Sequence, residues 1–501
     1  MSVLGIDVGT SGCKAAAFAS DGRCLGSAAG EYKTLYPRPG WAELDSRLVW
    51  QEVKKTIGRV AEQTCDDPIT CLSISSMGEA MTPVSSDRRI LGNCILLSDT
   101  RGDKYACQLE EAICQEDFYR ISPNILGAAY SLTRLLWIKE HQRELYDQAD
   151  HFLLWADLIA FMLGCEPTAS YSLAGRTLLF DIHKEDWSDL LLAKTGIARE
   201  KLGRTAPGGS QIGTVSNDVA TELGLSRNVK VVAGGHDQCC NALGAGICSA
   251  GSAVCGIGTF ECLTPVYDSL PDVRQLLKLG LGIEHHVLPG LYVSLIFNQS
   301  GSLVRWFRDT FAVADLKLSG PEIDIYEALS AEMPADPTRL LTLPYFEPTG
   351  PPGFVTNASG VILGLKPSTK RGDILKSIME SATFYFVESM RALSDMGIDT
   401  SQFIATGGGA RSDQWLQIKA DIFDIPFVRP KITEASLLGA AILAGAATGV
   451  FADPAEGVAC FVEPDRVFEP DENRTRLYAE QYEKYQQLFP LLRDFLAELE
   501  Q

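Results

Sequence analysis

The sequence predicts an α/β protein with two similar lobes and a ligand-binding cleft between them. The chain has 501 residues, more than one hydrophobic core usually serves, so two large units are expected. Short apolar runs typical of strands alternate with helical stretches along most of the chain. The segment Asp7-Val8-Gly9-Thr10 is similar to Gly256-Ile257-Gly258-Thr259, which indicates that each lobe begins with the same kind of hairpin. We therefore divide the chain near residue 245, into units 1–245 and 246–501.

The N-terminal half begins with three short strand-like runs. Residues 3–6 and 14–18 are apolar and are separated by a glycine-rich turn, and Asp21-Gly22 is a turn signal before the third run. Further apolar strands are predicted at 71–74 and 229–233. This order predicts a β-meander followed by alternating helices and strands.

The C-terminal half continues the same alternation. Strands are predicted at 292–297 and 403–406, with a long helix at 372–393 between them. The uncharged segment 435–452 is rich in Ala and Gly, which favours a helix packed inside a domain over a membrane span. Residues 465–499 predict a final helix with a stripe of aromatic side chains that serves packing.

Composition narrows the partners and the compartment. The formal net charge of −20 argues against a broad nucleic-acid or anionic-membrane surface. The 14 cysteines include no CxxC pair, and the N-terminus lacks the pattern of a signal peptide, so the sequence predicts reduced thiols in a cytoplasmic protein. Glu284-His285-His286 has no second ligand pair at metal spacing, which favours a structural role. A phosphorylated ligand would then be held by backbone N–H groups and a metal ion more than by massed Lys and Arg.

A carboxylate and a glycine-rich loop follow the first strand. Asp7 ends the strand, and the loop over residues 9–12 lets backbone N–H groups approach a phosphate closely. Asp7 would face Mg²⁺, through water, since that ion keeps much of its hydration shell. A tight hairpin turn that requires glycine is the alternative explanation of this segment.

A second carboxylate lies at a strand-to-helix junction. Gly234-Gly235-His236-Asp237-Gln238 follows the strand at 229–233 and precedes a helix of small residues. Such junctions hold ligands in α/β folds, and phosphoryl transfer needs a carboxylate within reach of the attacking hydroxyl. We predict that Asp237 is this general base. Helix capping by an aspartate is the alternative, although a cap alone does not require two preceding glycines.

A third glycine run follows the strand at 403–406. Gly407-Gly408-Gly409 opens a helix that passes Ser412, and its surface without side chains can lie flat against an adenosine. One glycine run before a helix is weak evidence for a nucleotide site. Three such loops in this order are much stronger.

These segments together resemble the FGGY family of carbohydrate kinases, within the superfamily that also holds actin, hexokinase and Hsp70. The likeness extends from about Val3 to Phe451 and is carried by GIDVGTSGCK, AGGHDQCCNALGAG, GIGT, SGSLVRWFRD and GGGARSDQWLQIKADIFDIPFVRP. It implies two ribonuclease H-like (actin-like ATPase) domains flanking a central cleft. The N-terminal domain would bind the sugar and supply the base, and the C-terminal domain would bind the nucleotide. It also implies ATP as phosphoryl donor and Mg²⁺ as its metal.

The resemblance also assigns residues. It places Asp7 at the metal and Asp237 at the catalytic base. The nucleotide-binding residues that it implies are Thr10, Ser11, Gly12, Lys14, Thr259, Gly301, Arg305, Gly408, Gly409 and Ser412. In the sugar pocket, Glu79 and Asp99 stand in segments that contact substrate in relatives, and Gln238 follows the base. Glu79 can accept two hydrogen bonds from sugar hydroxyls, and a salt bridge at a strand end is its alternative role.

Two other functions stay open at this point. A chaperone- or filament-type ATPase of the actin-like superfamily would share the phosphate hairpins but lack the pocket of Glu79, Asp99 and Asp237. A catalytically inactive sugar-sensing protein would bind its ligand without forming product, against which the presence of Asp7 and Asp237 speaks. The sequence leaves open whether the acceptor is a pentulose, a polyol or a sugar acid, and whether the chain forms a homodimer.

Overall fold

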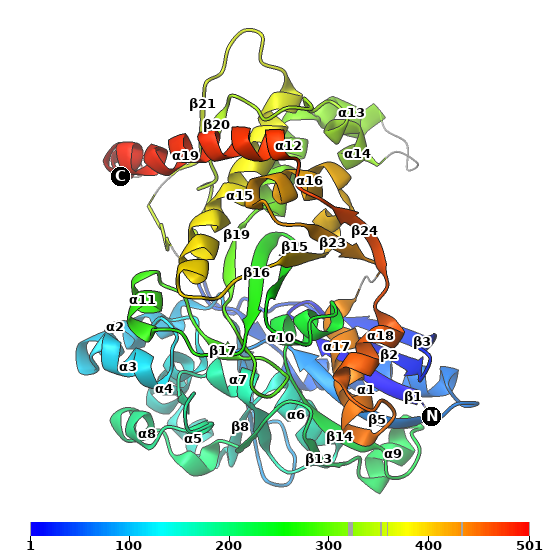
Figure 1. Cartoon of the computed structure of the whole chain (residues 1–501). Helices are drawn as coiled ribbons and strands as arrows, with labels where there is room; N and C mark the ends of the chain where they lie inside the picture. The colour runs from blue at the N-terminus through cyan, green and yellow to red at the C-terminus, as the bar shows by residue number, and fades with distance from the viewer. Residues whose placement is uncertain (1, 319–323, 351–352, 358, 432–433, 500–501) are drawn as a thin grey trace.

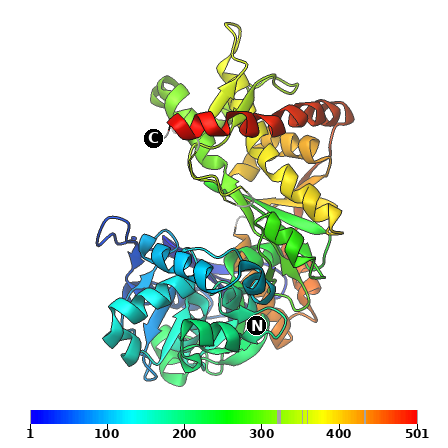
Figure 2. The same ribbon diagram turned by 90° about the vertical axis from the view of Figure 1, so that its left-hand side faces the viewer.

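The computed structural model describes residues 2–318, 324–350, 353–357, 359–431 and 434–499. Figure 1 and Figure 2 show two bodies, a lower one that contains most of the N-terminal half and an upper one that contains most of the C-terminal half. Each body is built on one large mixed β-sheet with helices around it. This is the α/β architecture that the sequence predicts.

The lower body contains a six-stranded sheet. Its strands are β1 (Ser2–Val8), β2 (Gly12–Ala19), β3 (Cys24–Glu31), β5 (Ile69–Ser76), β13 (Gln211–Thr214) and β14 (Lys230–His236). They lie in the order β13-β14-β5-β1-β2-β3. β1, β5 and β14 are parallel, whereas β2, β3 and β13 run antiparallel to their neighbours. The predicted meander of three strands at the N-terminus is confirmed.

The upper body contains an eight-stranded sheet. Its strands are β15 (Ser252–Ile257), β16 (Phe260–Tyr267), β17 (Glu284–His285), β18 (Tyr292–Val293), β19 (Ile296–Gln299), β22 (Gln402–Thr406), β23 (Phe427–Pro430) and β24 (Pro464–Phe468). β15 forms an antiparallel hairpin with β16 and pairs in parallel with β22 on its other side. The same arrangement joins β1 to β2 and β5, so the likeness between the two glycine-containing turns reflects a repeated unit.

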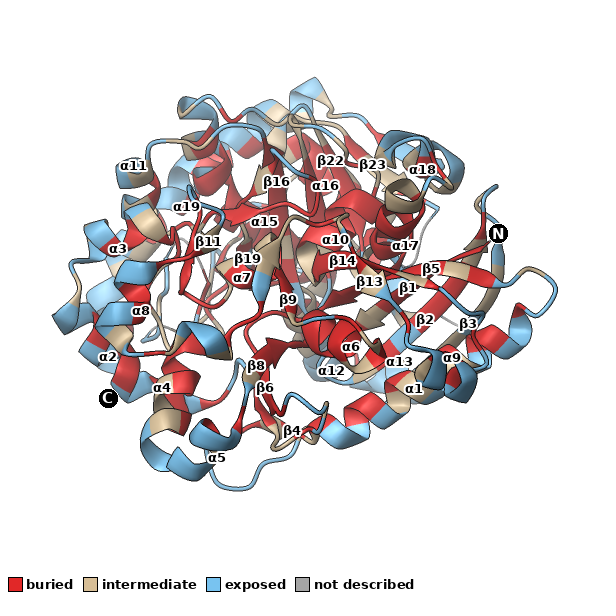
Figure 3. Cartoon of the chain, turned by 90° about the horizontal axis from the view of Figure 1, so that it is seen from below, coloured by how far each residue is buried: buried red, intermediate tan, exposed pale blue. Residues whose placement is uncertain are grey.

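Helices cover both sheets. Those used below are α1 (Ser46–Gln63), α4 (Ser131–His141), α6 (Trp155–Leu163), α7 (Tyr171–Gly175), α10 (Asp237–Gly244), α12 (Gly301–Phe311), α15 (Arg371–Asp395), α16 (Asp413–Phe423), α17 (Ala435–Thr448) and α19 (Glu472–Leu499). The strands in the middle of the molecule are buried, and the helices at its rim have exposed outer faces (Figure 3). No helix in the described part of the chain is both long and apolar enough to span a bilayer.

α17 comes late in the chain but packs on the lower body, beside α10 and against β1 and β5 (Figure 1). Its small residues allow this close contact, because Ala441 and Ala444 lie directly against Val3 and Cys71. The predicted buried helix in the Ala- and Gly-rich segment is therefore confirmed. The chain crosses from the lower to the upper body and returns, which no local pattern in the sequence indicated.

The contact between α17 and α10 yields a prediction on stability. A Cβ on Gly439 would lie 2.0 Å from the backbone oxygen of Cys240, so Gly439→Ala must push the two helices apart. We expect it to lower the free energy of unfolding by about 2–3 kcal/mol. Gly58, inside α1, is the matched control, because its Cβ would meet only Leu223 O at 3.9 Å. Gly58→Ala should stabilise by ~0.5–1 kcal/mol. Chemical denaturation of both variants tests the pair, and equal midpoints would contradict this packing.

The C-terminal segment differs from its predicted single helix. Residues Pro464–Phe468 form β24, which pairs antiparallel with β23, and α19 begins only at Glu472. Pro470 cannot continue a helix, and the Asp471 carboxylate accepts the N–H groups of Asn473 and Arg474 as an N-cap. The aromatic stripe of α19 packs on the core of the upper body, as predicted.

Candidate active site

Hydrogen bonds to backbone oxygens fix the turn between β1 and β2, and the residues at its tip are exposed. Gly9 N–H donates to Gly12 O at 2.9 Å, and the Tyr32 hydroxyl lies 2.7 Å from Gly9 O and 2.9 Å from Gly12 O. Thr10 and Ser11 at the tip are exposed. The turn is therefore fixed by its backbone, and its two hydroxyl side chains are available to a ligand.

The corresponding turn of the upper body is supported by α12. Gly258 N–H donates to Phe260 O at 2.9 Å, and Thr259 O accepts the N–H of Ser302 at 3.0 Å. A Cβ on Gly301 would lie 2.2 Å from Gly258 O, so only glycine allows α12 to begin this close to the turn. Thr259 itself is exposed.

A cavity of about 670 Å³ adjoins this second turn. The sequence-predicted residues that line it are Thr259, Gly301, Arg305, Gly408, Gly409 and Ser412. They come from the β15–β16 turn, from α12 and from the segment before α16, which are far apart in the sequence. Ser412 also caps α16 by accepting the N–H of Trp415 at 3.3 Å. The volume lies within the range of small-molecule sites.

Asp7 and Asp237 lie at the same edge of the lower sheet. Asp7 is the partner of Ser75 in the β1–β5 register, and His236, which precedes Asp237, is the partner of Ser76 in the β14–β5 register. Both carboxylates therefore stand at the carboxyl ends of parallel strands, with β5 between them, where open α/β sheets bind ligands.

The two glycines before Asp237 have a packing function. A Cβ on Gly234 would lie 1.8 Å from Ile74 O, and one on Gly235 would lie 2.5 Å from Ser172 Oγ. Glycine at both positions lets β14 approach β5 and α7 closely. This contact places the start of α10, and with it Asp237, at the sheet edge.

The acidity of both carboxyl groups is reduced. The Ser75 hydroxyl donates to Asp7 Oδ1 at 2.7 Å, but burial and the nearby Asp237 raise the pKa of Asp7 to about 7. Burial also raises the pKa of Asp237, an effect that the neighbouring His236 opposes. The Asp237 side chain keeps 31% of its surface exposed. A ligand can therefore reach it.

A network of buried charges continues from Asp237 toward the upper sheet. His236 Nε2 lies 3.4 Å from Asp237 Oδ1, and His236 Nδ1 lies 3.3 Å from Glu284 Oε2. Arg176 contacts Glu284 Oε1 through Nη1 and Glu79 Oε1 through Nε, the latter at 2.6 Å. Glu284 belongs to β17 of the upper sheet, so the network joins the two halves of the chain.

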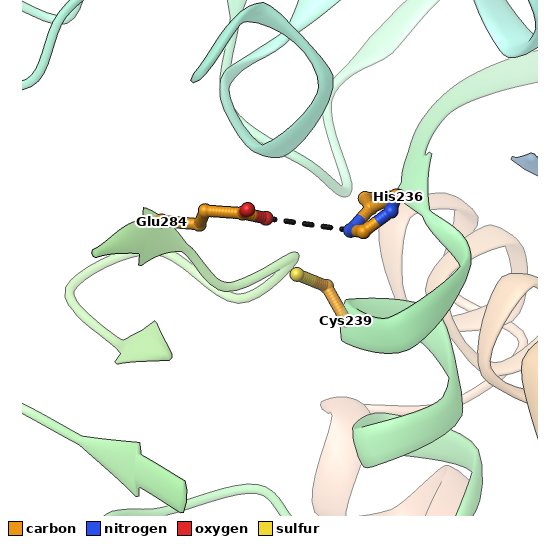
Figure 4. A group of neighbouring side chains, drawn as sticks. All are labelled: His236, Cys239 and Glu284. Atoms are coloured by element: carbon orange, nitrogen blue, oxygen red, sulfur yellow. Dashed lines mark ion pairs between the residues drawn. The ribbon is translucent and has the colours of Figure 1, made fainter. Parts of the chain in front are cut away.

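His236, Cys239 and Glu284 also form a group whose ligand atoms lie within 4.8 Å of one another (Figure 4). Burial raises the pKa of the Cys239 thiol well above its usual range, which keeps it protonated and a poor metal ligand. The guanidinium of Arg176 already lies against Glu284. An ion-pair network describes this group better than a metal site does.

Comparison with known proteins agrees with this geometry. The N-terminal-domain profile of the FGGY family of carbohydrate kinases matches residues 2–244, and the C-terminal-domain profile matches residues 281–448. The chain belongs to this family. It is therefore a phosphotransferase that acts on a sugar hydroxyl, and the family implies ATP as the phosphoryl donor.

Individual relatives are similar over their whole length. A xylulose kinase from Staphylococcus epidermidis is 29% identical, with 99% of this chain and 98% of the relative covered. An autoinducer-2 kinase from Escherichia coli K12 is 28% identical over 97% of this chain and 94% of the relative. A crystal structure of a xyloylose kinase from Brucella ovis superposes with a TM-score of 0.87 at 26% identity, covering 99% of this chain and all of that one (100%). The actin-like ATPase fold in two domains is thereby shown.

The residues predicted to form the active site do not all line one cavity. Asp7, Thr10 and Asp237 belong to the lower sheet and do not line the cavity beside Thr259. In this structure the two glycine-containing turns stand on different bodies.

The surroundings of Asp99 do not fit its predicted contact with substrate. Its side chain has 0% of its surface exposed and forms an ion pair with Arg101 at 2.7 Å. It also accepts the N–H groups of Ala42 at 2.6 Å and of Arg101 at 2.8 Å. These bonds occupy both carboxylate oxygens, so Asp99 positions Arg101 and the chain around Ala42 and does not present itself to a sugar.

Lys14 and Gln238 lie near the site, but their contacts give weaker support to their predicted roles. Lys14 Nζ forms an exposed ion pair with Glu434 at 2.6 Å, so its ammonium group must exchange partners to reach a phosphate. Gln238 is half-buried in the first turn of α10, beside Asp237. Glu79 is buried and takes part in the charge network through Arg176.

Several site residues were missed by sequence reasoning. Arg176 follows the short helix α7, and no glycine loop or motif marks it. For Glu284 the sequence predicts a structural role, because no second ligand pair lies at metal spacing. Tyr326 and Trp415 line the large cavity but look like ordinary core or surface aromatic residues in the sequence. Only the fold brings these side chains to the two sites.

Proposed function

We propose that this kinase transfers the γ-phosphoryl group of Mg²⁺-bound ATP to a hydroxyl of a small sugar or polyol, with Asp237 as the general base. The observation that carries the proposal is the position of Asp237. Its carboxylate is partly exposed, it starts α10, and it stands beside Asp7 at the carboxyl edge of the lower sheet. A base for the acceptor and a metal-facing carboxylate are needed together in phosphoryl transfer.

In this mechanism the lower body binds the acceptor and the upper body binds the nucleotide. Asp237 accepts the proton of the attacking hydroxyl as the new P–O bond forms. The backbone N–H groups of the turns at Thr10 and Thr259 stabilise the negative charge of the phosphoryl group. Closure of the two bodies would bring both turns to one phosphate chain and exclude water, which otherwise competes with the sugar as acceptor.

The surroundings of Asp7 fit a divalent cation. Asp7 and Asp237 lie close enough together for Asp237 to raise the pKa of Asp7. Mg²⁺ prefers oxygen ligands of the kind that carboxylates provide. Asp7 would hold the ion, with the Ser75 hydroxyl orienting the carboxylate at 2.7 Å. Bound there, Mg²⁺ would offset the charge of the triphosphate.

Gly408 offers a test of the nucleotide site. A Cβ on Gly408 would meet no atom within 4 Å, because the residue faces the open cavity. Gly408→Val should therefore fold normally, place its side chain where the nucleotide is proposed to lie, and raise the KM for ATP by about 10-fold or more. Steady-state kinetics and thermal denaturation measure the two effects. An unchanged KM for ATP would contradict a nucleotide site in the cavity at Gly408.

A screen of acceptors tests the function as a whole. The purified chain is mixed with MgATP and single members of a panel of ketoses, polyols and sugar acids, and ADP release is measured. We expect ADP release to rise strongly with at least one acceptor and to stay low without one. Acceptor-independent ATP consumption would favour a chaperone- or filament-type ATPase, and thermal stabilisation by a sugar without product would favour a sensor.

A further inference from the structure

A fully buried ion pair lies inside the upper body, near the large cavity. Lys419 of α16 and Glu261 of β16 each have 0% of the side chain exposed, and Lys419 Nζ lies 2.5 Å from Glu261 Oε1. Because two charges must be taken out of water, apolar side chains of similar volume often stabilise a protein as much as such a pair or more. Neither residue has a part in the proposed chemistry. Stability alone therefore does not explain the pair.

Through Glu261 the pair reaches the turn at Thr259 and the start of α12. Glu261 comes two residues after Thr259, and its Oε2 accepts the hydroxyl of Ser300 at 2.7 Å. Ser300 directly precedes α12, where a serine side chain usually caps the helix, but its side chain makes no capping bond to α12. The carboxylate thus holds the residue before Gly301, which lines the cavity.

Through Lys419 the pair reaches two other walls of the cavity. Nζ donates to Thr383 Oγ1 at 3.2 Å, and that hydroxyl donates to Met379 O on α15 at 2.9 Å. Nζ also lies 5.2 Å from the centre of the Trp415 ring on α16. Met379 and Trp415 both line the cavity. One ammonium group thus links α15 to α16 at these walls.

The Trp415 ring in turn supports the glycine run before α16. A Cβ on Gly409 would lie 3.2 Å from Trp415 Cζ3, so the run passes close to the ring. Gly408, Gly409 and Ser412 line the same cavity. The elements β16, α12, α15 and α16 are far apart in the sequence, and in the upper body the pair links all four (Figure 1).

We propose that the Lys419–Glu261 ion pair is a positioning device that sets the shape of the nucleotide cavity. The inference rests on the proposed function, because it takes the cavity beside Thr259 as the nucleotide site. Hydrogen bonds to charged groups are short and directional, whereas apolar side chains can pack in several ways. The pair therefore fixes Ser300 and Thr383, and with them two walls of the cavity, more narrowly than an apolar contact would.

An apolar replacement of the pair separates positioning from stability. Glu261→Leu and Lys419→Met each leave one buried charge unpaired, and each should lower Tm by about 5 °C or more. The double variant carries neither charge, and its Tm should return to within ~2 °C of that of the unaltered chain. Its Kd for MgADP, measured by calorimetry, should still rise by about 10-fold or more, because Ser300, Thr383 and Trp415 each lose a partner. A double variant that regains both Tm and Kd would overturn the inference.

Ser300→Ala decides the question if the double variant does not regain its stability. It leaves the ion pair intact and removes only the bond from Glu261 to the residue before α12. We expect its Tm to stay within ~2 °C of that of the unaltered chain and its Kd for MgADP to rise by about 5-fold or more. An unchanged Kd in this variant would contradict the positioning role.

The matched control is another ion pair of α16. Asp421 has 1% of its side chain exposed and pairs with Arg474 Nε at 2.6 Å, and neither residue lines the large cavity. Arg474→Met should therefore leave the Kd for MgADP unchanged. A rise equal to that in the double variant would show that any disturbed ion pair of α16 weakens binding, and it would overturn the assignment to Lys419 and Glu261.

Hydrogen exchange separates this inference from the proposed function. If the unaltered chain binds no MgADP, the nucleotide proposal fails, and amide exchange in the nucleotide-free protein decides the positioning role. In Ser300→Ala the backbone N–H groups of residues 302–304 should then exchange about 10-fold faster or more, while those of β1 and β5 keep their rates. Unchanged rates at 302–304 overturn the inference.

Discussion

Replacement of Asp237 by alanine is expected to lower the turnover number by ~10²–10⁴-fold, with little change in nucleotide affinity. The reason is local, because Asp237 stands at the carboxyl edge of the lower sheet and the large cavity of the upper body does not include it. Asp237→Asn should lose nearly as much, since the amide keeps the shape but cannot accept the proton. Single-turnover kinetics with saturating MgATP, together with a measured Kd for the nucleotide, give both quantities.

The matched control for this change is Asp189→Asn. Asp189 is also the first residue of a helix, α8 (Asp189–Thr195), but its side chain is 86% exposed and pairs loosely with Arg199 at 3.3 Å. Exposed pairs of this kind contribute little to stability, so this variant should keep normal turnover. Normal turnover in Asp237→Ala as well would show that another group accepts the proton.

Asp7→Asn is expected to reduce turnover by about 10²–10³-fold, because it removes the carboxylate that would hold the metal. The magnesium concentration that gives half-maximal rate should rise in parallel. Asp21→Asn, in the exposed turn after β2, is the control and should change neither quantity. A turnover and a magnesium dependence both equal to those of the unaltered chain would exclude Asp7 from metal binding.

The same substitution should stabilise the metal-free protein. Burial and Asp237 raise the pKa of Asp7 from 3.8 to about 7, so the folded state holds a proton that the unfolded state has released. A raised pKa contributes stability that is complete below pH ~4 and is lost as pH rises through ~7. The gain in Asp7→Asn should therefore be near zero at pH 4 and reach up to about 4 kcal/mol at pH 8. Denaturation in the presence of a chelator measures it, and a gain that shrinks with rising pH would contradict this explanation.

Most of the fold follows from local patterns. The strands at the start of each half, the strand-to-helix junction at Asp237 and the buried helix α17 were all predicted, because apolar periodicity and glycine turns act over a few residues. The segment before α19 was not, since Pro464–Phe468 forms a strand only through its pairing with β23. Gly408 and the other residues of the C-terminal half that the sequence assigns to a nucleotide line one cavity, because their loops lie at the ends of predicted strands, and their role stays a prediction.

The sequence by itself determined the α/β class, the two glycine-containing turns, and the carboxylates at positions 7 and 237, since each depends on neighbours within one strand and one turn. The tertiary structure alone decided what surrounds those carboxylates. Arg176 and Glu284 are more than a hundred residues apart in the chain, and they meet only because β17 of the upper sheet lies against α7 of the lower body. The return of α17 to the first sheet likewise depends on two surfaces of small residues that match only when folded. Charge and shape around these carboxylates are products of such distant contacts, which no short segment encodes.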